Sequence, residues 1–253
     1  MALTMSAPFY TNNKERPMLM ASVTLILTRT PLHEFVYTSR GNVDADNMTD
    51  EERARFYRSR TQPLDRPPNV IHYSGRWGSL LLLRGPRVYG VVSITDNSPA
   101  PATVGGQNVT LADQNLQLTT DGAAIGHSKE YTSMERYRTD YGDLRGRWVM
   151  LHPRPNAYDL TYDPHNPVVQ TLRTGHSGNC IRVGGGDPGP EQGILIHEAP
   201  NVTWLKGCIS PRPKDDKREF ENADGNPSFR AQDEIMRELN TYGAGRGSLY
   251  VLV

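Results

Sequence analysis

Residues 193–211 read "GILIHEAPNVTWLKGCISP", and this stretch carries most of what the sequence says about fold and chemistry. The apolar run Ile194–Ile196 predicts a short buried strand that ends at His197. A Pro/Asn segment follows, and the chain then returns through a Lys-Gly pair to Cys208. A strand end, a short loop and the start of the next element can bring the imidazole and the thiol together over this distance.

A cysteine beside a histidine has the chemistry of a nucleophile. A thiol with a pKa of about 8.5 is mostly neutral at physiological pH, and a neighbouring imidazole can take its proton and stabilise the thiolate. A third group, either a carboxylate or a backbone carbonyl, must orient the imidazole. Gly207 has no side chain, so we expect amides beside Cys208 to form an oxyanion hole. The stretch therefore predicts Cys208 as nucleophile and His197 as its base.

The pattern "ILIH…GCI" resembles the catalytic signature of L,D-transpeptidase-like domains, in which a strand ending in His precedes a loop and Ser-His-Gly-Cys-Ile/Val-Arg. Its short form is similar to a branch of phage and bacterial proteins, and to effectors of type VI secretion that act on the cell wall. The resemblance implies a Cys208 acyl-enzyme formed on peptidoglycan stem peptides. It also implies that His197 is the base, oriented by the backbone carbonyl of the next residue, Glu198.

The resemblance covers residues 193–209 and has departures. Leu205-Lys206 stands where the family has Ser-His, Glu198 where it often has Gly, and Ser210 where it has Arg. These departures bear on substrate binding more than on the Cys-His pair. The side chains that we expect to contact substrate are Asn201, Trp204, Lys206 and Arg182. Simple packing is the alternative for Trp204, and a solvated charge is the alternative for Lys206.

The second cysteine, Cys180, lies in "GHSGNCIRV" (175–183), which has its own likeness to Cys-Ile-Arg. His165 lies upstream of it at a loop distance that the family allows. However, Asn179 replaces the Gly before the cysteine, and His165 sits between prolines with no apolar strand before it. The run "CIRVGGG" reads as a strand, so we expect Cys180 and Arg182 beside the site. A Cys180–Cys208 disulfide remains an alternative.

The rest of the chain predicts a mostly β fold, a sandwich or barrel of the L,D-transpeptidase-like kind, with one or two helices. Alternating apolar residues mark strands at 22–30, 33–41 and within 70–95. The best helix spans 226–243, with Asn226 as cap, and a polar helix is expected at 49–60. We expect a flexible arm at 1–20 and one domain at 21–253, with polar insertions at about 42–68 and 96–146.

The charge of the chain is balanced, with 28 basic against 28 acidic residues. There is therefore no excess of positive charge that would attract nucleic acid. No apolar run reaches the length of a membrane span, and no metal site or cofactor is expected. The N-terminus does not resemble a secretory signal. We therefore expect synthesis in the cytoplasm and, after non-classical export, action in the periplasm or cell wall, as an antibacterial effector or phage product.

Two function classes remain open from the sequence. The first is a cysteine enzyme with L,D-transpeptidase, L,D-carboxypeptidase or D-amino-acid exchange activity. Its partners would be peptidoglycan stem peptides and an immunity protein or secretion-apparatus protein. The second is a non-catalytic structural or cell-wall-binding protein that retains the fold.

Overall fold

A computed structural model of the chain describes residues 22–40, 70–94, 106–111, 114–141, 144–147, 151–162, 180–184, 193–205, 207–218 and 227–252. The expected arm at 1–20, the helix at 49–60 and the insertion at 42–68 lie outside these residues.

The main sheet has nine strands in the order β11-β10-β9-β8-β12-β1-β2-β6-β7. A further pairing between β11 and β6 closes the sheet on itself as a barrel. The strands are β1 (Ser22–Arg40), β2 (Val70–Gly85), β6 (His127–Tyr141), β7 (Leu144–Arg147), β8 (Tyr158–Tyr162), β9 (Cys180–Gly184), β10 (Leu195–His197), β11 (Ile209–Pro213) and β12 (Arg246–Leu252). The predicted mostly β class is confirmed, with one helix in the described part of the chain.

The central core lies between these strands and the helix α3 (Pro227–Gly243). Alternate residues of β1 point into this core, and the register places Leu25 opposite Leu82 and Leu27 opposite Leu80. The predicted apolar stripe of the helix packs against them through Ala231, Ile235, Met236 and Leu239. A Cβ at Gly247 of β12 would lie 2.6 Å from Cδ2 of Leu239, so only glycine lets α3 approach this strand.

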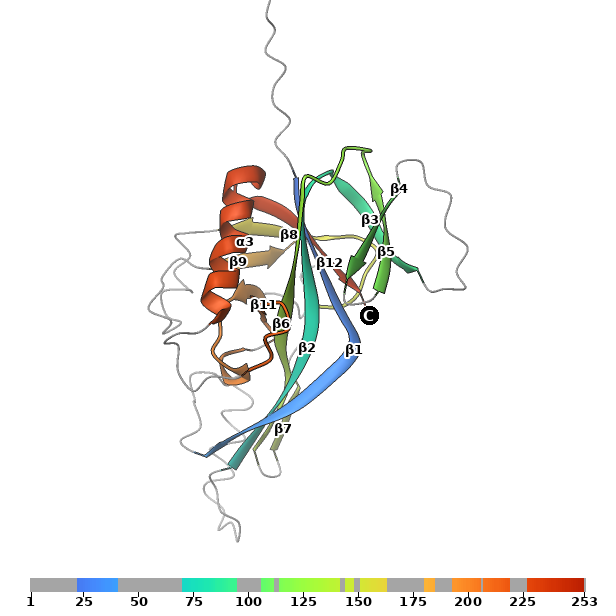
Figure 1. The fold of residues 1–253 in the computed structure, drawn as a ribbon. Coiled ribbons are helices and arrows are strands. Elements are labelled where there is room, and N and C mark those ends of the chain that lie inside the picture. The colour runs from blue at the N-terminus through green and yellow to red at the C-terminus, as the bar shows by residue number, and fades with distance from the viewer. Residues whose placement is uncertain are drawn as a thin grey trace, which may run out of the picture.

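The opposite side of the long strands is covered by a separate three-stranded sheet. Its strands are β3 (Val88–Ile94), β4 (Gly106–Leu111) and β5 (Gln114–Thr120), in the order β3-β5-β4. Ile26 and Leu81 from the main sheet pack against Leu116 and Leu118 of β5 in a cluster of their own. Figure 1 shows α3 on one side of β1 and β2 and the three-stranded sheet on the other. Both faces of β1 between Val23 and Arg29, and of β2 between Leu80 and Leu83, are therefore buried.

Three strand predictions change in the structure. The strands expected at 22–30 and 33–41 form one strand, β1, with an irregularity in its pairing between Thr28 and His33. The short runs at 70–75 and 77–85 likewise join in β2. The interpretation of 96–146 as a polar insertion was wrong, because the segment contains β4, β5 and the central strand β6. Composition misled there because β6 is buried by pairing with β2 and β11, which lie far away in sequence.

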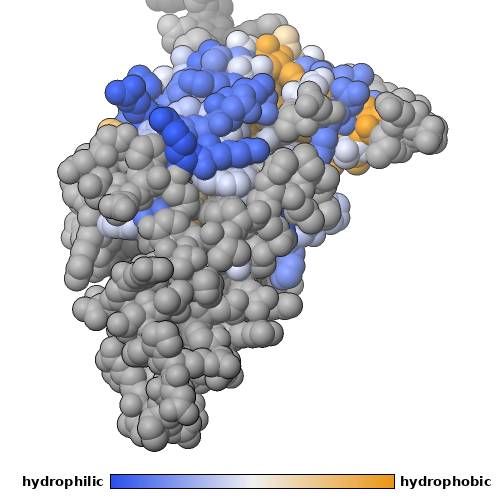
Figure 2. Space-filling model, turned by 60° about the horizontal axis from the view of Figure 1, so that its bottom comes forward, coloured by the Kyte–Doolittle hydropathy of each residue, from blue (hydrophilic) through white to orange (hydrophobic). Residues whose placement is uncertain are grey.

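The described part of the face drawn in Figure 2 is mainly hydrophilic. Figure 2 shows polar residues over most of the coloured surface and hydrophobic residues in small groups. The most exposed large apolar side chains are Tyr89 and Val92 of the edge strand β3. Across the part of the chain that the structure describes, no helix is both long and apolar enough to cross a membrane.

Candidate functional site

The site forms around the end of the short strand β10. His197 is the last residue of this strand and lies opposite Cys180 of β9 in the antiparallel register. On the other side, Ile196 pairs in parallel with Ile209, the first residue of β11, which Cys208 immediately precedes. Ile196 and Ile209 belong to the central core, whereas both cysteines belong to a second cluster. Because side chains alternate along strands, His197 and both thiols share one side of the sheet.

The imidazole of His197 is held between Cys208 and its own chain neighbour. Nδ1 lies 2.7 Å from the backbone carbonyl oxygen of Glu198. A carbonyl oxygen only accepts hydrogen bonds, so Nδ1 must carry a proton and donate it. Nε2 is thereby left for the hydrogen bond between the imidazole and the Cys208 side chain. The predicted base, its orienting carbonyl and the predicted nucleophile are thus in one line of contacts.

The surroundings raise the pKa of His197 above its usual value near 6.5. Complete burial acts in the opposite direction, because it disfavours the charged imidazolium. The hydrogen bond and charge of Cys208, together with the carbonyl and charge of Glu198, outweigh that penalty. The site therefore favours a positively charged imidazole beside the sulfur atom, which is the arrangement that stabilises a thiolate.

Gly207 determines the direction of the backbone immediately before Cys208. Its φ of +74° lies in the left-handed region, which side chains other than glycine enter at a cost. Its N–H donates to the carbonyl oxygen of Arg136 in β6 at 3.2 Å. An oxyanion hole that used the Gly207 amide, as the sequence suggested, would have to break this bond.

The site is closed in this conformation. His197 is 3% exposed and Cys208 is 8% exposed. The short 3-10 helix η2 (Val202–Trp204) and the residue after it supply Val202, Trp204 and Leu205 to the cluster that contains the thiol. The side chains that form this cluster around the two cysteines are Tyr73, Trp77, Met134, Leu195, Ala199, Val202, Trp204 and Leu205. A peptide can reach the sulfur atom only if part of this cover moves.

The residues predicted to contact substrate lie in different surroundings. Asn201 is buried, and its carbonyl oxygen accepts the N–H of Trp204 at 3.4 Å. Trp204 is half-buried and packs against the cluster around Cys208. This is the simple packing that the sequence offered as the alternative to substrate contact. Arg182 is exposed on β9, opposite Leu195 in the register. Lys206 lies outside the described residues.

The topology argues against the alternative of a Cys180–Cys208 disulfide. Both residues are buried thiols, and β10 lies between the strands that carry them. Two strand spacings amount to about 9.6 Å. Disulfides need Cα atoms within about 7 Å of each other. A bridge would therefore require β10 to leave its place between β9 and β11.

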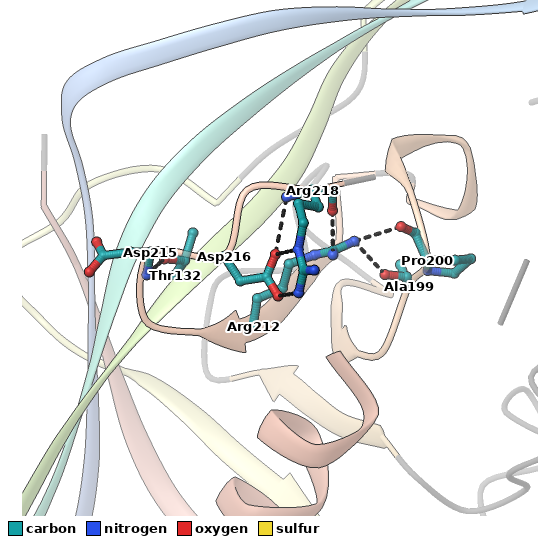
Figure 3. Close-up of polar contacts among 7 residues, drawn as sticks. All are labelled: Thr132, Ala199, Pro200, Arg212, Asp215, Asp216 and Arg218. Atoms are coloured by element: carbon teal, nitrogen blue, oxygen red, sulfur yellow. Dashed lines mark hydrogen bonds and ion pairs between the residues drawn. The ribbon is translucent and has the colours of Figure 1, made fainter. Parts of the chain in front are cut away.

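Sequence reasoning missed the residues that hold the segment after His197. Ser228 and Gln232 of α3 bond to the backbone of residues 199 and 196, and Arg212 of β11 bonds to the carbonyl oxygens of Ala199 and Pro200. Figure 3 shows the Arg212 guanidinium reaching these two carbonyls and that of Arg218. A signal was available for the helix residues, because Ser228 and Gln232 are polar residues on its buried stripe.

Among the residues for which positions are given, no group of three or more His, Cys, Asp or Glu side chains is arranged to hold a metal ion. In comparisons with protein-family models, curated proteins and solved structures, no match to this chain was found.

Proposed function

We propose that the protein is a cysteine enzyme that transfers or hydrolyses acyl groups of peptidoglycan stem peptides, with Cys208 as nucleophile. The observation that carries the proposal is the line of contacts from Cys208 through His197 to the Glu198 carbonyl. This arrangement contains a nucleophile, a base and an orienting acceptor, which together define covalent catalysis by cysteine. A buried histidine with a merely structural role needs no thiol at its second nitrogen.

The chemistry follows from the proton positions. Nε2 of His197 takes the thiol proton, and the sulfur of Cys208 forms a bond to the acyl carbon of a diaminopimelate or lysine residue. The tetrahedral intermediate collapses when Nε2–H gives its proton to the leaving amine of the terminal D-amino acid, and the C–N bond breaks. The resulting thioester is then attacked by water or an amine, whose proton returns through Nε2 to the sulfur.

The substrate class rests on the resemblance of residues 193–209 to L,D-transpeptidase-like domains. Attack by water on the thioester gives carboxypeptidase activity, attack by the amine of a neighbouring stem gives transpeptidase activity, and attack by a free D-amino acid gives exchange. The proposed site of action is the periplasm or cell wall. An effector with this activity would need an immunity protein in the producing cell.

A second candidate is a non-catalytic cell-wall-binding or structural protein with the same fold. The observation that favours it is the burial of Cys208 in an apolar cluster with residues of η2. In that case the thiol would be a small apolar residue of the cluster, as buried cysteines often are.

Digestion of purified peptidoglycan distinguishes the two candidates. The wild-type protein and Cys208→Ala are each incubated with cell-wall sacculi, and the released muropeptides are identified by mass spectrometry. The enzyme predicts shortened, cross-linked or exchanged stems with the wild type and none with Cys208→Ala. Unchanged muropeptides with folded wild-type protein would reject the enzyme, and binding to sacculi without turnover would support the second candidate.

A further inference from the structure

The peptide unit between Glu198 and Ala199 is bonded at both of its polar ends. Its carbonyl oxygen accepts the proton of His197 Nδ1 at 2.7 Å. Its N–H, which belongs to Ala199, donates to Oγ of Ser228 in α3 at 3.1 Å. Because a trans peptide is planar, its C=O and N–H point in opposite directions. A hydroxyl that fixes the N–H therefore also fixes the direction of the carbonyl that orients the imidazole.

We propose that Ser228 is a positioning residue that controls the protonation of the Cys208–His197 pair through the Glu198–Ala199 peptide unit. This inference deepens the proposed function, on which it rests for its catalytic meaning. The influence of Ser228 on the imidazole passes through the backbone, because Oγ accepts the N–H of the peptide unit whose carbonyl oxygen bonds to Nδ1. Hydrogen bonds in such a chain polarise one another, so the bond at the N–H also strengthens the carbonyl as an acceptor.

The position of Ser228 is itself well determined. Its Oγ lies 2.8 Å from Oγ of Ser210, which is two residues after Cys208 on β11. Ser210 and Ser228 are both fully buried. The hydroxyl pair therefore links the strand of the nucleophile to the segment that carries the base. Ser210 occupies the position at which the L,D-transpeptidase-like signature has Arg.

The neighbouring peptide units are held in the same way. Gln232, one helical turn after Ser228, donates from Nε2 to the carbonyl oxygen of Ile196 at 2.9 Å. Arg212 donates from Nη2 to the carbonyl oxygens of Ala199 at 3.0 Å and Pro200 at 2.6 Å. Figure 3 shows the guanidinium of Arg212 between these carbonyls and the turn at 214–218. The backbone on both sides of the orienting carbonyl is thus fixed, which leaves this peptide unit little freedom to rotate.

The test measures the protonation of Cys208 without any substrate of the proposed enzyme. The folded full-length protein is alkylated with iodoacetamide between pH 5 and pH 10, and mass spectrometry of the Cys208 peptide gives the rate. Ser228→Ala removes the acceptor for the Ala199 N–H. The Glu198–Ala199 peptide unit is then free to turn, and its carbonyl oxygen stabilises the imidazolium of His197 less well. The pKa of the Cys208 thiol therefore rises, and the midpoint of alkylation moves to higher pH. On the rising limb of the profile, below the midpoint, a shift of half a unit to one unit lowers the rate at a given pH by roughly three- to tenfold.

Two control variants separate positioning from a loss of stability. Ser228→Thr keeps the hydroxyl and is expected to restore the wild-type midpoint. Ile235→Val removes a methylene from the buried face of the same helix, away from the segment, and is expected to leave the midpoint unchanged. If Ser228→Ala does not fold, Gln232→Met carries the test, with a smaller shift in the same direction.

The outcomes for this inference and for the proposed function are distinct. A profile for Ser228→Ala that superimposes on the wild type would overturn the positioning role, whatever the protein does to peptidoglycan. A shifted profile together with unchanged muropeptides would support the positioning role and reject the proposed enzyme. Equal shifts in Ser228→Ala and Ile235→Val would mean that general loosening moves the midpoint, and this would also overturn the inference.

Discussion

Cys180 lies within β9 and faces His197 across the antiparallel register, whereas Cys208 ends the loop that leads into β11. Cys180 is 0% exposed, and as the first residue of β9 it pairs with His197 of β10. Cys208 follows a glycine in the left-handed region and hydrogen-bonds to the imidazole. The comparison teaches that the path by which the chain reaches the histidine predicted which cysteine hydrogen-bonds to the imidazole, whereas likeness to a Cys-Ile-Arg motif did not.

The largest difference between the two cysteines is expected in turnover. Cys208→Ala removes the atom that forms the thioester and should lower muropeptide conversion by about a thousandfold or more. Cys180→Ala removes a buried sulfur that has no step in the reaction and should change the rate at most about threefold. Initial rates for the two purified variants check this prediction, and equal losses would break the distinction between the cysteines.

The next largest effect is expected at the histidine that the two cysteines share. His197→Gln keeps a polar side chain of similar size but cannot take the thiol proton, so turnover should fall roughly a hundredfold or more. The alkylation midpoint of Cys208 should rise because the imidazolium is lost. Cys180 should show no such dependence on His197, and peptide-resolved alkylation measures both thiols in one experiment. A Cys208 midpoint equal to that of the wild type would contradict the pairing.

The pH profile of turnover follows from the raised pKa of His197. Because the pKa is raised, the imidazolium persists above its usual limit near pH 6.5 and remains available to protonate the leaving amine. The descending limb of the rate should therefore lie above pH 6.5, with a loss of about tenfold per unit beyond the midpoint. A rate that falls already between pH 5.5 and pH 6.5 would show that the pKa of His197 is not raised.

The smallest effect concerns the glycine that gives Cys208 its approach. Gly207→Ala places a side chain at φ +74° and should lower the free energy of unfolding by about 1 kcal/mol. Gly184→Ala, in β9 on the Cys180 side, is the matched control, since a Cβ there has open space and no positive φ. Urea denaturation of both variants measures the difference. Equal stabilities would mean that the left-handed turn places no constraint on Cys208.

The sequence predicted the parts of the molecule that depend on local pattern. The apolar stripe predicted a helix at 226–243, and the structure has α3 at Pro227–Gly243. The run before His197 predicted the strand that delivers this residue to the site, and β10 ends there. These features need only a few neighbouring residues to specify them, so a single sequence was sufficient.

Features that depend on distant partners could not be predicted in this way. β6 looks polar because most of its buried residues, such as Thr132, Ser133 and Glu135, are themselves polar. Its place in the sheet depends on pairing with β2 and β11. Ser228 accepts a hydrogen bond from the N–H of Ala199, which lies 29 residues earlier in the chain, so no spacing rule connects the two residues. The occupied amide of Gly207 likewise depends on Arg136 of β6. Tertiary hydrogen bonds to backbone atoms leave no mark on the sequence of the partner.

The most direct test of the central claim is to trap the acyl-enzyme. The wild-type protein is incubated with a synthetic stem tetrapeptide, quenched in acid and digested, and mass spectrometry locates the added acyl group. The account predicts a thioester on Cys208, absent from His197→Gln under the same conditions, with Cys180 unmodified. An adduct on Cys180, or turnover of the peptide with no adduct on Cys208, would contradict it.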